Sequence, residues 1–142
     1  MTLHNDWRRM GLTMNLGEGH KAPMQLDANM GIVNALQEML LYVSKDLVKI
    51  LPACPDKFSK GNVKGFRFCT GEIDFSWDKE LGKFSSELKS KRETNITLLL
   101  PEICEEYELL YVETGEKNLI QKRSAFTVNL PKGCSLIIKN KD

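Results

Sequence analysis

Apolar residues recur at three- and four-residue steps between Asn29 and Ser44. This spacing places them on one face of an amphipathic helix. Asp27 or Asn29 can cap the first turn, because a short side-chain oxygen accepts the unpaired amide hydrogens there. Lys45 lies near the other end, where a positive charge is favoured. The pattern therefore predicts a helix over about residues 29–44. Its apolar face comprises Ile32, Val33, Ala35, Leu36, Met39, Leu40 and Val43.

After Leu47 the period of the apolar positions changes to two. Ile73, Phe75 and Trp77 alternate with acidic residues and serine, as a half-buried strand requires. Turn residues separate the candidate strands at 52–55, 59–61, 81–82, 114–115 and 131–133. Many short strands at this spacing are typical of an antiparallel sandwich or barrel. The further candidates are residues 48–51, 63–69, 83–90, 96–100, 107–113, 118–123, 125–130 and 135–139.

The first 26 residues show neither period. Such a segment cannot close a hydrophobic core of its own. We therefore expect two parts: residues 1–46, an irregular segment followed by one amphipathic α-helix, and residues 47–142, an antiparallel β-sandwich. The fold class is mainly β.

The net charge and the length of the apolar runs argue against two classes of partner, nucleic acids and membranes. Lys and Arg total 20 against 19 Asp and Glu in 142 residues, so no net field attracts the chain to nucleic acid or anionic lipid. No apolar run approaches the roughly 20 residues that a membrane span needs. The first residues carry acid and arginine where a secretory signal has an apolar core. We expect no nucleic-acid or membrane partner, and a cytoplasmic location by default, although a longer parent could be exported.

The four cysteines, Cys54, Cys69, Cys104 and Cys134, lie far apart without a Cys-x-x-Cys pair. This spacing indicates reduced, structural thiols. A zinc site needs clustered ligands, and the two histidines are far in sequence from every cysteine, so we expect no metal and no cofactor. Residues 95–97 match the Asn-x-Thr glycosylation pattern, which we interpret as strand sequence.

Residues suited to binding and catalysis gather at the front of the chain. A tryptophan beside arginine, acids, amides and histidine is the mixture that stacks on a sugar ring and bonds its hydroxyls; the alternative is a solvated loop and a helix cap. Asp27 has the same two interpretations: a cap, or an acid kept ionised by backbone dipoles and ready to activate a neighbour. The candidate substrate-binding residues are His4, Trp7, Arg8, His20, Gln25 and Asn29.

Four ordered motifs resemble glycoside hydrolase family 95, which contains α-L-fucosidases and α-L-galactosidases. The first motif, residues 23–31, reads Pro-Met-Gln-Leu-Asp-Ala-Asn-Met-Gly and is similar to the family's Pro-Phe-Gln-Ile-Asp-Gly-Asn-Phe-Gly. The second motif, residues 50–55, reads Ile-Leu-Pro-Ala-Cys-Pro beside the family's Leu-Leu-Pro-Ala-Leu-Pro. The third motif, residues 61–68, is similar to the family's Gly-Ser-Val-Lys-Gly-Leu-Arg-Ala. The fourth motif is residues 71–77. The match covers about residues 15–90.

The resemblance implies where this region lies in the family's longer chain and by which mechanism the family acts. In the family this region is the end of a long chain, where the last part of an (α/α)6 catalytic barrel precedes a C-terminal β-sandwich. These enzymes invert the anomeric centre, and an aspartate that maps onto Asp27 activates an asparagine base. No stretch here matches the surroundings of that asparagine or of the general acid. Ala28 and Met30 stand where the family has glycine and phenylalanine, so the sugar contacts differ.

Three hypotheses follow. The chain is the C-terminal portion of a family 95-like glycoside hydrolase and is inactive alone, with a face around Ile32, Leu36 and Met39 left for the rest of the barrel. Alternatively, it is a stand-alone carbohydrate-binding or structural β-sandwich module without catalysis. In the third hypothesis it completes a barrel with a separately encoded polypeptide. The expected partners are thus a carbohydrate and the remainder of the barrel.

Overall fold

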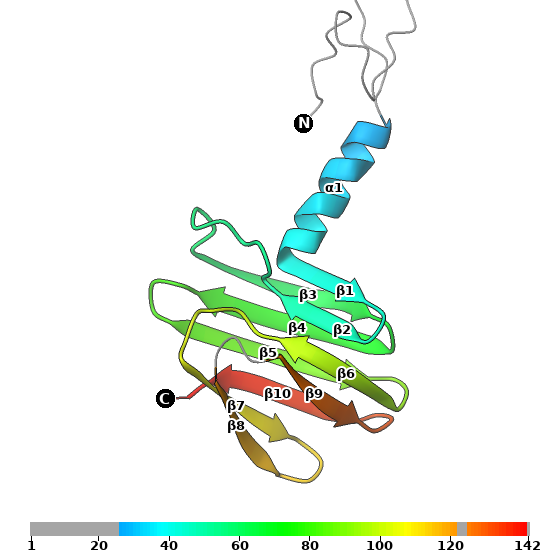
Figure 1. The fold of residues 1–142 in the computed structure, drawn as a ribbon, viewed down its shortest axis with the longest axis vertical. Coiled ribbons are helices and arrows are strands. Elements are labelled where there is room, and N and C mark those ends of the chain that lie inside the picture. The colour runs from blue at the N-terminus through cyan, green and yellow to red at the C-terminus, as the bar shows by residue number, and fades with distance from the viewer. Residues whose placement is uncertain (1–25, 122–124, 142) are drawn as a thin grey trace, which may run out of the picture. The chain divides into compact units, whose positions relative to one another are not determined.

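The computed structural model describes residues 26–121 and 125–141, with side chains from Met30 onward. One helix precedes ten strands in this part of the chain (Figure 1). The elements are α1 (Leu26–Leu40), β1 (Leu41–Ser44), β2 (Leu47–Ile50), β3 (Lys60–Phe68), β4 (Gly71–Asp78), β5 (Lys83–Ser90), β6 (Thr94–Leu99), β7 (Glu106–Tyr111), β8 (Lys117–Gln121), β9 (Ala125–Leu130) and β10 (Ser135–Asn140).

The strands form two sheets, which confirms the expected β-sandwich preceded by a helix. The small sheet has the order β1-β2-β6-β9, and the large sheet has the order β3-β4-β5-β10-β7-β8. The β2–β6 ladder is parallel, and every other described ladder is antiparallel. The β2–β6 ladder therefore brings the carboxyl ends of two strands, and the loops that follow them, to one edge of the small sheet.

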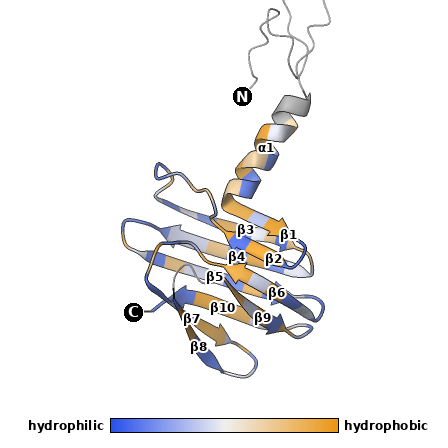
Figure 2. Ribbon diagram, viewed as in Figure 1, coloured by the Kyte–Doolittle hydropathy of each residue, from blue (hydrophilic) through white to orange (hydrophobic). Residues whose placement is uncertain are grey.

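The alternation of apolar and polar residues builds one core from both sheets (Figure 2). Along β4 the buried Ile73, Phe75 and Trp77 alternate with more exposed polar residues. The small sheet contributes buried side chains from all four strands, including Val48, Ile96 and Val128. Every buried hydrophobic residue of the described chain lies at Leu41 or later.

The helix differs from the prediction at both ends. It begins at Leu26, so Asp27 and Asn29 lie within the first turn instead of before it. It ends at Leu40, where the prediction continued to residue 44, because Leu41–Ser44 pairs with β2. The spacing of Leu40 and Val43 suited a helix, but aromatic and β-branched residues favour a strand. Lys45, expected near the end of the helix, lies in the turn between β1 and β2 with φ 49°.

Most strands appear where the period-two pattern predicts them, with shifted ends. The bounds of β5 and β9 agree with the prediction. β3 begins at Lys60, inside the predicted turn at 59–61, and β7 ends at Tyr111, before the predicted end at 113. Met39–Asp142 forms one compact unit, so β1 belongs with the sandwich, whereas the sequence pattern assigned it to the helical segment. No helix of the described residues is long and apolar enough to cross a bilayer.

Candidate functional site

The predicted sugar-binding residues fall at the edge of the described chain. His4, Trp7, Arg8, His20 and Gln25 lie outside the described residues. Asp27 and Asn29 are placed by their backbone in the first turn of α1, and their side chains also lie outside the described part. The roles assigned to these seven residues therefore stay predictions.

Apolar side chains of α1 are exposed. The exposed fraction is 70% for Met30, 54% for Val33 and 47% for Leu36. Ile32 and Met39, expected on the same face, are half-buried. Adjacent exposed apolar side chains on one helix are typical of a surface that contacts a partner.

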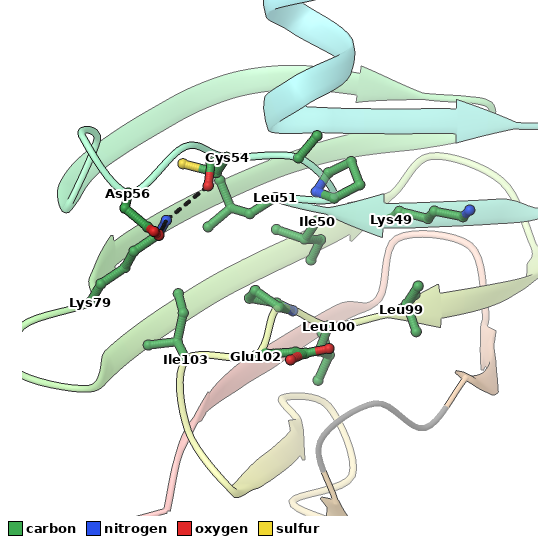
Figure 3. A pocket seen from close by; sticks show the side chains of 13 residues that line it. Lys49, Ile50, Leu51, Cys54, Asp56, Lys79, Leu99, Leu100, Glu102 and Ile103 are labelled. Carbon is green, nitrogen blue, oxygen red and sulfur yellow. Dashed lines mark hydrogen bonds and ion pairs between the residues drawn. The ribbon is translucent and has the colours of Figure 1, made fainter.

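A groove of about 830 Å³ opens where the parallel strands β2 and β6 end (Figure 3). Its size is within the range of small-ligand sites. One wall is the loop that follows β2, and the facing wall is the chain from Leu99 to Ile103. The described residues that line it are Lys49, Ile50, Leu51, Pro52, Ala53, Cys54, Asp56, Lys79, Leu99, Leu100, Pro101, Glu102 and Ile103.

The loop after β2 contains the second motif and is held in place by hydrogen bonds. Leu51 has φ 52°, an uncommon conformation for a residue with a side chain, and its N–H donates to the carbonyl of Leu40 at 2.8 Å. Lys79 Nζ donates to the carbonyls of Cys54 at 2.8 Å and Pro55 at 3.1 Å, and lies 3.3 Å from Asp56 Oδ1. The three ammonium protons are thus directed at this loop, which makes Lys79 a structural clamp.

The facing wall is fixed by Tyr107, whose buried hydroxyl donates to the carbonyl of Pro101. Burial raises the pKa of Tyr107 and also that of the nearby Cys104 thiol, so both stay protonated at neutral pH. The described lining residues include no histidine. The groove is large enough to accommodate a small ligand.

The third and fourth motifs pack against each other as the β3–β4 hairpin. A Cβ at Gly61 would lie 2.5 Å from the Trp77 ring, so only glycine lets the ring approach. Gly65 has φ 69° at an irregularity in the ladder, and its N–H donates to Asp74 Oδ1 at 2.6 Å. Trp77 Nε1–H donates to the carbonyl of Phe58 at 3.0 Å. Sequence analysis did not foresee these roles, although paired glycines beside an aromatic strand are a usable signal.

Two observations concern metals and thiols. Within the described ranges, no three His, Cys, Asp or Glu side chains are arranged to hold a metal ion.

All four cysteines are free thiols. Burial raises the pKa of Cys134, with Glu113 adding to the effect, so this thiol is not an activated nucleophile.

A comparison of the chain with models of known protein families finds no family model that matches it. The fold is a β-sandwich preceded by a helix, and the chain is similar to part of a glycoside hydrolase. That protein is Alpha-L-fucosidase 2 of Arabidopsis thaliana, which is 35% identical over 88 residues, or 58% of this chain. The matched region is 10% of the fucosidase, so the chain corresponds to a small part of that enzyme.

Proposed function

We propose that this chain is the C-terminal portion of a family 95-like glycoside hydrolase that acts on α-L-fucosides or related glycosides. The observation that carries the proposal is the 35% identity to part of Alpha-L-fucosidase 2. The order of the motifs adds support, because the first precedes the sandwich and the other three lie within its first four strands and their loops. In this proposal the chain up to the end of α1 completes an (α/α)6 barrel, and the sandwich, which begins with β1, follows it.

The proposed reaction inverts the anomeric centre. A protonated carboxyl group donates to the leaving oxygen while a base on the opposite face of the sugar activates water. Asp27 acts by orienting and polarising an asparagine base supplied by the preceding part of the enzyme. His20, Gln25 and Asn29 contact the sugar, with further contacts from His4, Trp7 and Arg8. Because acid and base lie elsewhere, the isolated chain is inactive.

The exposed apolar side chains of α1 support the proposal that the rest of the barrel packs against this helix. Met30, Val33 and Leu36 are each about half exposed or more, and their burial by the rest of a helical barrel would remove apolar surface from water. Three of the four motifs support the same division of roles, because their described contacts build the sandwich. The sandwich is thus proposed as the structural module of the enzyme.

The four free thiols support a reducing compartment, because exported proteins commonly pair their cysteines. We therefore keep the cytoplasm as the proposed location of the chain.

The experiment compares the parent protein with single variants of it. The parent should release fucose from an α-L-fucosyl oligosaccharide, with the β-anomer as first product by NMR. Asp27→Ala should lower kcat at least about a hundredfold, while Asp46→Ala, in the exposed β1–β2 turn, should leave kcat unchanged. Equal loss in both variants, or full activity of Asp27→Ala, would overturn the proposed role.

A second candidate is a stand-alone carbohydrate-binding or structural module. The observation in its favour is that Met39–Asp142 is a compact unit, and that all of its described buried hydrophobic residues lie at Leu41 or later. Deletion of residues 1–38 distinguishes the two candidate functions. A stand-alone module should self-associate neither before nor after the deletion, whereas a chain that exposes barrel contacts should self-associate only before it.

A further inference from the structure

The last turn of α1 takes hydrogen bonds from the second motif. The final carbonyl groups of a helix have no partner within it, and basic side chains near the end often bond to them. The last turn of α1 contains no basic residue. Here the N–H of Leu51 donates to the carbonyl of Leu40 at 2.8 Å, and the N–H of Ala53 donates to that of Met39 at 3.4 Å. The second motif therefore anchors the C-terminal end of α1.

The backbone of Leu51 is strained at this anchor. Its φ of 52° lies in the left-handed region, which a residue with a Cβ seldom adopts. The side chain is buried, so core packing and the bond to Leu40 together hold this conformation. Strained residues persist where their surroundings determine them, and they are concentrated at functional sites. The strain at Leu51 is a reason to ask what the anchor does besides closing a loop.

The end of β4 holds the anchor from its other side. Lys79 directly follows β4, and its N–H donates to the carbonyl of Ser59 at 2.7 Å. Its ammonium group donates to the carbonyls of Cys54 and Pro55 (Figure 3). Only 25% of the Lys79 side chain is exposed, which limits the access of water to these bonds. The second motif is thus bonded to Lys79 on one side and to the last turn of α1 on the other.

The first motif lies at the opposite end of the same helix. α1 is 15 residues long and continuous from Leu26 to Leu40, which gives it a length of about 22 Å. A change of about 10° in the direction of such a helix moves its first turn by roughly 4 Å. A displacement of about 1 Å in a catalytic group can lower a rate about a hundredfold. An anchor at the last turn can therefore affect Asp27 without contacting it.

We propose that Lys79 is a positioning residue for Asp27 and acts through the second motif and α1. Lys79 holds the loop, the loop bonds the last turn of α1, and the first turn of α1 presents Asp27 to the asparagine base of the barrel. This inference rests on the proposed glycosidase function and extends it, because the sandwich then sets the rate of the reaction as well as supporting the barrel.

The first experiment measures kcat of the parent protein on an α-L-fucosyl oligosaccharide. Lys79→Met should lower kcat at least about tenfold. In the Asp27→Ala background the same change should lower kcat less than about twofold, because the group that Lys79 positions is already absent. Urea unfolding of each variant shows that it is folded under the conditions of the assay.

The matched control for stability is Leu130→Ala. Leu130 is fully buried in β9, which lies at the edge of the small sheet opposite to β1. Its truncation should destabilise the fold at least as much as Lys79→Met does, but should leave kcat unchanged.

The second experiment needs no activity and follows amide hydrogen exchange by NMR in the chain of 142 residues. Lys79→Met should raise the exchange rate of the Leu51 amide at least about tenfold, because opening of the second motif no longer breaks the bonds of Lys79. Leu130→Ala should speed exchange at Ile138 in β10, which is paired on both sides. It should not speed exchange at Leu51, because a local opening leaves β9 intact.

Three results would overturn the proposal. They are an unchanged kcat in Lys79→Met, an equal fall of kcat in the parent and Asp27→Ala backgrounds, and an equal rise of Leu51 exchange in Lys79→Met and Leu130→Ala. A parent without fucosidase activity would instead overturn the proposed function and with it the effect on Asp27. The exchange experiment would then still decide whether Lys79 and the second motif anchor α1.

Discussion

The first motif differs in kind from the other three, although all four resemble the same family. The first motif, residues 23–31, holds Gln25, Asp27 and Asn29, whose side chains suit sugar chemistry. The second, third and fourth motifs hold glycines, prolines and aromatic residues that build a loop and a hairpin. The difference teaches that similarity to a family within the sandwich indicates a similar architecture. Similarity in function depends on the short segment that precedes the sandwich.

This comparison predicts that substitutions in the last three motifs lower the stability of the isolated chain, whereas a substitution in the first does not. Urea unfolding, followed by tryptophan fluorescence or circular dichroism, measures the free energy of unfolding for each variant.

The largest effect is expected for Trp77→Ala in the fourth motif. Trp77 is 7% exposed, packs 5.9 Å from Phe75 between ring centroids, and donates a hydrogen bond to Phe58. Its truncation should cost about 3–5 kcal/mol, because it leaves a cavity in the core and an unpaired carbonyl. Leu81→Ala is the control, since Leu81 is 67% exposed, and should change the free energy by less than about 0.5 kcal/mol. Similar values for the two variants would contradict the structural role of the motif.

The next effect is expected for Lys79→Met, which removes the clamp on the second motif. The carbonyls of Cys54 and Pro55 then lose a charged donor, and the free energy of unfolding should fall by about 1.5–3 kcal/mol. Lys83→Met, at the exposed start of β5, is the matched control and should have little effect. Equal losses in the two variants would show that the loss of a positive charge, and not the loss of the clamp, lowers the stability.

A smaller effect on the free energy of unfolding is expected when the pH is lowered and Glu108 becomes protonated. The hydrogen bond from Lys117 holds the pKa of Glu108 below 4.5, with Lys139 adding to it. Because the pKa is lower in the folded state, this contribution is present above about pH 4.5 and is lost as the pH falls through the lowered value. Glu108→Gln should therefore lower stability slightly near pH 7 and leave it unchanged near pH 3. A larger difference at pH 3 than at pH 7 would reverse the assigned sign.

No effect on stability is expected for Asp27→Ala in the isolated chain. The described core begins at Leu41, so the free energy of unfolding should stay within about 0.5 kcal/mol of the parent chain. A loss above about 1 kcal/mol would show that the first motif is itself part of the sandwich's support.

Most of the sandwich could be predicted from the sequence, for a physical reason. Period-two burial is local, so Ile73, Phe75 and Trp77 identify their strand without tertiary information. The end of the helix was mispredicted because residues 41–44 satisfy both periods, and pairing with β2 decides between them. The parallel β2–β6 ladder and its groove depend on contacts between distant segments, which no local pattern contains.

The candidate site was predicted only as a set of residue types. Asp27 was assigned its role by resemblance, because catalytic geometry arises when separate segments meet. The clamp of Lys79 on Cys54 and Pro55 was not predicted, because it joins residues about 25 positions apart.

The most direct test of the central claim is the mass of the native gene product in the source cells. An antibody raised against the sandwich, used on a blot, should detect a band several times larger than the 16.2 kDa of this chain. That result would agree with a C-terminal portion of a larger glycoside hydrolase. A band at 16.2 kDa would contradict it.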